Sequence, residues 1–101
     1  MWNRREHFRE VIEVLSRWDG NRQLLIGAAH EYWAAAFEPE EWPEPLRTSH
    51  VRICTLIFNK GNIRASIEAL DEPAAHLAAA DLLTLANAGL NRSSRRPHVA
   101  V

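Results

Sequence analysis

Residues 51–70 read VRICTLIFNKGNIRASIEAL, and this stretch decides the fold class. Residues 51–58 are rich in types that favour strands, and residues 63–70 alternate apolar and polar side chains for most of their length. With residues 59–62 as a turn, the two segments could pair as a β-hairpin at about 51–69, which would make the fold α+β. However, an isolated hairpin is only marginally stable, and the sequence offers no third strand beside it.

The same stretch also fits two helices, and this is the interpretation that we favour. Gly61 follows a lysine and is typical of a helix end, while Asn62 can cap a short helix that follows. The apolar residues of the first helix fall on one arc of a helical wheel: Leu46, Ile53, Cys54, Ile57 and Phe58. Those of the second are Ile63, Ile67 and Leu70.

Three longer helices are predicted around this stretch. Residues 3–18 form an amphipathic pattern that begins with a capping-box-like pair, Asn3 and Glu6. Residues 22–37 are apolar around most of the circumference, which predicts the central helix or one whose second face meets another subunit. Residues 71–88 begin at an aspartate cap and are expected to end at Gly89. The sequence therefore predicts an all-α fold, a compact bundle of four to five helices.

Composition indicates one globular domain. The chain has 101 residues, of which 47% are hydrophobic and 25% charged, and it is too short for two separate cores. No apolar run reaches the roughly 20 residues that a membrane span needs, and the first residues are charged rather than an apolar export signal. Cys54 is the one cysteine, which fits a reducing compartment. We expect a cytoplasmic protein with a single helical domain over residues 1–90.

Residues 91–101 differ from the rest and are expected to form a flexible basic tail. They hold three of the twelve basic residues and none of the thirteen acids: Arg92, Arg95 and Arg96. Residues 1–90 therefore carry nine bases against thirteen acids. The net negative charge of residues 1–90 makes them a poor surface for nucleic acid, because non-specific affinity comes mostly from basic side chains that neutralise phosphates. The tail could still serve as a short nucleic-acid-binding arm.

The helices at 22–37 and 71–88 carry more apolar surface than a chain of this size hides easily. We expect a homodimer to bury the surplus, and protein–protein contact rather than catalysis to be the function. Trp18 and Trp33 have the spacing of core residues. Trp42, in the acidic, proline-rich segment 38–45, is expected to pack back on the core, with partner binding as the alternative. The candidate interface residues are Trp2, Trp42, Ala79 and Leu83.

A small-ligand or metal-binding bundle is a further alternative. His50 and Cys54 lie four residues apart and would share a helix face, but zinc needs one or two more ligands. Asp81 falls within an apolar arc, where it is expected to pair with an arginine such as Arg52 or Arg64, or to be exposed at the rim. Alternatively, Asp81 could line a ligand pocket with His50 or His30. A second helical metal site could involve His7 with Glu6 and Glu10, or His30 with Glu31.

Catalysis and cofactor binding are not indicated. The serines lack a Gly-x-Ser-x-Gly context, and the four glycines are too widely spaced for a phosphate-binding loop. We therefore predict no catalytic residue, no cofactor and no metal.

The sequence Gly61-Asn62-Ile63 followed by Leu70 resembles the start of a Fis-type helix-turn-helix. The resemblance covers residues 61–70 and implies a DNA-binding or transcription-related module with residues 74–85 as the reading helix. The family has two small residues where this chain has Ser66 and Ile67. Residues 74–85 also contain no Arg, Lys, Gln or Asn for base contacts.

Overall fold

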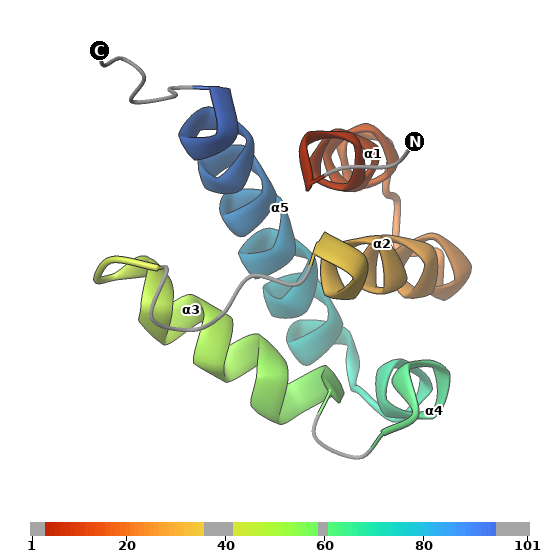
Figure 1. Cartoon of the computed structure of the whole chain (residues 1–101). Helices are drawn as coiled ribbons and strands as arrows, with labels where there is room; N and C mark the ends of the chain where they lie inside the picture. Colours follow the sequence, from red (N-terminus) through yellow and green to blue (C-terminus); the bar gives the residue numbers. More distant parts are fainter. Residues whose placement is uncertain (1–3, 36–41, 59–60, 95–101) are drawn as a thin grey trace, which may run out of the picture.

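The computed structural model describes residues 4–35, 42–58 and 61–94, with the side chains of Arg4 and of 92–94 excepted. Within these residues every regular element is helical and no strand is present. The elements are α1 (Arg4–Ser16), α2 (Arg22–Ala35), α3 (Leu46–Ile53), η2 (Cys54–Phe58), α4 (Ile63–Glu68) and α5 (Glu72–Ser94), as Figure 1 shows. The predicted all-α bundle is confirmed, and the alternative with a hairpin at 51–69 is wrong.

The stretch that decides the fold is helical because its isoleucines recur at helical spacing. Ile53 and Ile57 are four residues apart and both are fully buried. The helix that carries them changes from α to π geometry at Cys54, a feature that the sequence pattern did not predict. Gly61 then turns the chain with a φ of +74°. Asn62 caps α4 as predicted, its Oδ1 accepting a hydrogen bond of 2.9 Å from the Ala65 N–H.

Helix α5 lies in the middle of the bundle, with α1 and α2 on one side and α3 on the other (Figure 1). The prediction that residues 22–37 form the central helix is therefore wrong. Small side chains explain the difference, because they let neighbouring helices approach α5 from more than one direction. Buried alanines lie along much of its length: Ala75, Ala78, Ala79 and Ala86.

The expected end of the last helix at residue 88 is also wrong, since α5 continues to Ser94. Gly89 is buried inside this helix rather than placed after it. A Cβ atom at Gly89 would lie 2.5 Å from Cε2 of Phe8, which belongs to α1. The glycine thus allows a close approach of two helices. Residues 91–94 of the proposed tail are helical, and the rest of it, including Arg95 and Arg96, lies outside the described residues.

The core is shared by all the helices and by the segment before α3. Its largest fully buried side chains are Trp42, Phe8, Leu25, Ile53, Ile57, Ile67, Leu82, Leu85 and Val11. In the part of the chain that the structure describes, no helix combines the length and the apolar character needed to cross a membrane.

Candidate functional site

A row of rings runs from the core to the surface between α2 and the continuous α3–η2 helix. We call it the aromatic row, and its members in order from the inside are Trp42, His50, Tyr32, Phe58 and Trp33. It starts at a fully buried tryptophan and ends at one whose side chain is 57% exposed. No other large apolar residue among those described is as exposed.

The inner end of the aromatic row is a buried polar network. The Tyr32 hydroxyl lies 2.7 Å from Nδ1 of His50 and shares a hydrogen bond with it. On the other side of the imidazole, Nε2 lies 3.5 Å from Sγ of Cys54. Burial, together with the nearby Cys54, raises the pKa of Tyr32 well above its ordinary value. Burial also raises the pKa of Cys54. The network therefore favours a protonated hydroxyl and a protonated thiol, a poor setting for a nucleophile.

The outer end of the aromatic row places Trp33 at the surface. The rings of Tyr32 and Phe58 are nearly parallel, with an interplanar angle of 10° and centroids 6.3 Å apart. Phe58 in turn contacts Trp33, with centroids 4.7 Å apart. The expectation that Trp33 packs in the core is wrong. Trp33 follows the buried Tyr32 by one position, which turns it about 100° away from the core.

Two of the four predicted interface residues, Trp42 and Ala79, lie in the interior. Trp42 is fully buried within the chain, with its ring 6.4 Å from that of Phe8, so it is not available as a surface anchor. Ala79 is only 7% exposed, because it packs inside the bundle. Leu83 is half-buried against the core. Trp2 lies outside the described residues.

Asp81 forms an ion pair with Arg52, one of the two arginines predicted for it. Arg52 Nε donates to one carboxylate oxygen over 2.7 Å and Nη2 donates to the other over 2.9 Å. These hydrogen bonds and the adjacent charge raise the pKa of Arg52. His30 is exposed on α2, and His50 is engaged with Tyr32 and Cys54. The proposed ligand pocket of His30, His50 and Asp81 is therefore not assembled.

The residues considered as alternative metal ligands are likewise divided between separate contacts. His7 Nδ1 lies 2.8 Å from Glu31 Oε1, which links α1 to α2. His50 and Cys54 are close together but supply only two ligands. Within the described ranges, no group of three or more His, Cys, Asp or Glu residues is placed to hold a metal ion. The contact between His7 and Glu31 was not predicted, since these residues are far apart in the sequence.

The arrangement of α4 and α5 does not favour DNA reading in the helix-turn-helix manner. A reading helix needs one side free to enter the major groove, whereas α5 is packed by α1, α2 and α3. The exposed residues at its start, Asp71 and Glu72, would also repel phosphates. The side chain of Arg92 and the whole of Arg95 and Arg96 lie outside the described residues.

The pattern of the sequence missed two further exposed apolar residues. Val51 on α3 is 51% exposed and Leu77 on α5 is 45% exposed, although Leu77 has the spacing of the buried face. Comparison with known proteins gives no assignment, because no family model, curated protein or solved structure matches the chain.

Proposed function

We propose that this protein acts by protein–protein contact, that Trp33 anchors the contact surface, and that a second copy of the chain is the partner. The observation that carries the proposal is the exposed Trp33 ring held against Phe58. Tryptophan is among the residues most enriched at the energetic centres of interfaces. An exposed tryptophan on a fixed support is therefore the best candidate for such a centre here.

The support beneath Trp33 favours tight binding. Phe58 stacks on Tyr32, and Tyr32 is fixed in turn by its hydrogen bond to His50. A side chain that is already positioned loses less conformational entropy when a partner covers it. The polar network at the inner end of the aromatic row thus serves to hold the outer end in place.

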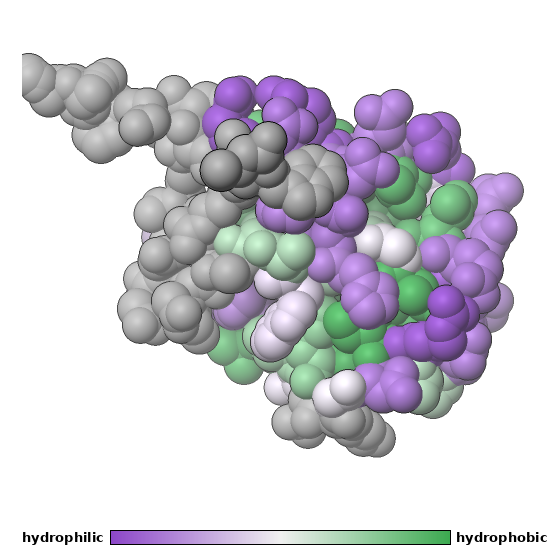
Figure 2. Space-filling view, turned by 45° about the vertical axis from the view of Figure 1, so that its right-hand side comes forward, coloured by the Kyte–Doolittle hydropathy of each residue, from purple (hydrophilic) through white to green (hydrophobic). Residues whose placement is uncertain are grey.

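The surface of α2 around Trp33 suits a second helix. Its exposed neighbours on this side are Gly27, His30 and Ala34, of which two carry little or no side chain. A Cβ atom built on Gly27 would meet nothing within 4 Å, so the space above it is open. Figure 2, turned toward the side of α1, α2 and α4, shows apolar surface among hydrophilic side chains in the lower half of this face. A symmetric pairing of two such faces would cover apolar area on both copies.

Two chemical features agree with a role in binding rather than catalysis. The raised pKa values of Tyr32 and Cys54 disfavour both as nucleophiles at neutral pH. Cys54 is a free thiol, which supports action in the reducing environment of the cytoplasm.

The proposal is tested by native mass spectrometry and sedimentation velocity over a range of concentrations. We expect a dimer for the natural chain and a monomer for Trp33→Asp, because the charge would be buried without a partner. Leu77→Asp is the matched control, since it changes a similarly exposed apolar residue on a different helix. It should leave the dimer intact. A natural chain that stays monomeric at every concentration, or a dimeric Trp33→Asp variant, would overturn the proposal.

A further inference from the structure

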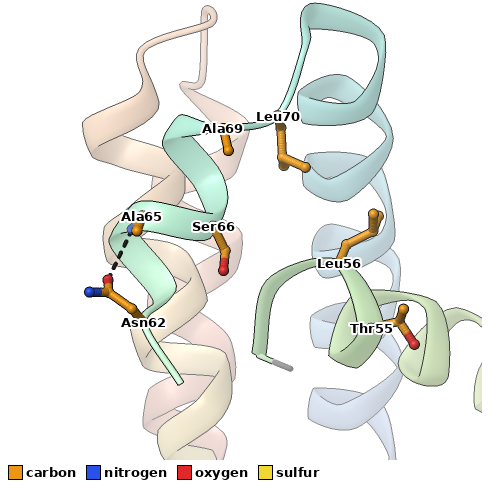
Figure 3. A pocket seen from close by; sticks show the side chains of 7 residues that line it. All are labelled: Thr55, Leu56, Asn62, Ala65, Ser66, Ala69 and Leu70. Carbon is orange, nitrogen blue, oxygen red and sulfur yellow. Dashed lines mark hydrogen bonds between the residues drawn. The ribbon is translucent and has the colours of Figure 1, made fainter. Parts of the chain in front are cut away.

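A cavity of about 470 Å³ lies between η2 and α4. Its volume is within the range of small-molecule binding sites. Two leucines and two alanines provide most of the apolar wall, and the polar residues are Ser66 of α4, its cap Asn62 and Thr55 of η2. The residues that matter for its chemistry are Leu56, Asn62, Ala65, Ser66, Ala69 and Leu70, which Figure 3 shows as sticks.

Ser66 is the central polar group of this cavity. The residue is only 8% exposed, and its side chain points from α4 into the space beside η2 (Figure 3). Its backbone N–H bonds to the Asn62 carbonyl over 3.0 Å, but among the described residues its hydroxyl has no hydrogen-bond partner. The hydroxyl oxygen is not sealed off from the cavity. It is therefore available to a molecule that enters the cavity.

The rest of the lining defines the chemistry of that molecule. Asn62 Oδ1 is already engaged, because it caps α4. Leu56 of η2 and Leu70 after α4 both line the cavity and supply apolar surface (Figure 3). None of the described residues that line the cavity is charged. An ion would therefore gain no counter-charge from these residues when it entered the cavity.

We propose that this cavity binds a small uncharged molecule that has an apolar body and one hydroxyl or amide group. The polar group bonds to Ser66 Oγ, and the apolar body lies between Leu56 and Leu70. The site does not depend on the contact surface at Trp33, because it involves different residues and requires no second copy of the chain.

The probe for this proposal is 1-hexanol. Its binding to the full chain is measured by the changes that it causes in amide chemical shifts in two-dimensional NMR spectra. We expect saturable shifts confined to residues 55–56 and 62–70. Sodium hexanoate, which has the same chain length and a charge, should bind more weakly. Ser66→Ala should weaken 1-hexanol binding about three- to tenfold, the usual effect of losing one hydrogen bond. Ser49→Ala, which changes a serine on α3 outside the cavity, should leave the affinity unchanged.

A second variant keeps the test decisive if Ser66→Ala does not fold. Ala65→Leu adds side-chain volume at an exposed position on the cavity wall and should abolish binding while Ser66 remains. The proposal is overturned if the shifts do not saturate or lie elsewhere. It is equally overturned if hexanoate binds as tightly as hexanol. The proposal would also be contradicted if Ser66→Ala or Ala65→Leu folded and bound 1-hexanol with the affinity of the natural chain.

Discussion

The contact between α1 and α5 and the contact between α2 and α3 are built in opposite ways. Helices α1 and α5 have closely approaching backbones, and Phe8 lies directly over Gly89. Helices α2 and α3 make almost no close backbone approach, and ring side chains span the distance between them. The first contact depends on small residues and van der Waals packing. The second depends on large residues and on the hydrogen bond between Tyr32 and His50.

The difference shows in the side chains that fill each contact. At Gly89 there is no room for any side chain on α5, because the Phe8 ring occupies the space. A wide separation leaves room for an imidazole and a hydroxyl that satisfy each other. The wide contact is also the one that reaches the surface, at Trp33. The comparison predicts that the two contacts respond differently to substitution.

Phe8→Ala should have the largest effect because Phe8 belongs to both contacts. Its ring covers Gly89 and lies 6.2 Å from the ring of Tyr32. We expect the free energy of unfolding to fall by about 3–5 kcal/mol, the usual loss for a buried phenylalanine. Urea denaturation monitored by tryptophan fluorescence measures this free energy of unfolding. Val51→Ala, at an exposed site, should change the same quantity by less than about 0.5 kcal/mol. Similar losses in the two variants would contradict the assigned role of Phe8.

Gly89→Ala should break the close contact alone. The added methyl group would overlap the Phe8 ring and cost about 1–3 kcal/mol. The cost appears even though alanine is the better helix former. Thermal unfolding measured by circular dichroism tests the prediction.

Gly27→Ala is the matched control for that variant, since Gly27 lies in a helix with open space above it. At concentrations where the chain is monomeric, it should raise stability by roughly 0.5–1 kcal/mol. If both glycine variants were stabilised, the close approach of α1 to α5 would be refuted. A loss of stability that appears only at concentrations where the chain dimerises would reflect the second copy packed over Gly27.

Tyr32→Phe should weaken the wide contact. The variant keeps the ring and its stacking on Phe58, but it removes the partner of His50 Nδ1. We expect a loss of about 1–2 kcal/mol because a buried polar atom then has no partner from this hydroxyl. Chemical denaturation at neutral pH measures the loss. Stability equal to that of the natural chain would show that the hydrogen bond contributes nothing.

The pH dependence of stability should also distinguish the two contacts. The folded state raises the pKa of Tyr32, so above about pH 10 the folded chain retains a proton that the unfolded chain loses. Stability is therefore unaffected by this group at lower pH and falls as the pH rises beyond that value. The decline should be smaller in Tyr32→Phe, whereas Gly89→Ala should keep it in full. Parallel pH profiles for all three chains would contradict this assignment.

Local features of the fold could be predicted because they depend on neighbours in the sequence. The caps at Asn62 and Asp71 were expected, and both side chains accept hydrogen bonds of 2.9 Å from the helix that follows. Arg52 was one of the arginines named as a partner for Asp81, since a carboxylate within an apolar arc needs a partner. The candidate site could not be predicted in this way. Trp33 and Leu77 have the spacing of core residues, and only the placement of neighbouring helices leaves them exposed.

Helical periodicity and caps thus established the all-α class and the approximate helix boundaries, because each depends on interactions within a few residues. Tertiary packing decided the remaining features. It made α5 central, placed Gly89 against Phe8 rather than after a helix end, and left Ser66 facing a cavity. The physical reason is that an apolar residue has the same tendency to be buried on either side of a helix. Which side is covered depends on contacts between residues that are distant in the chain.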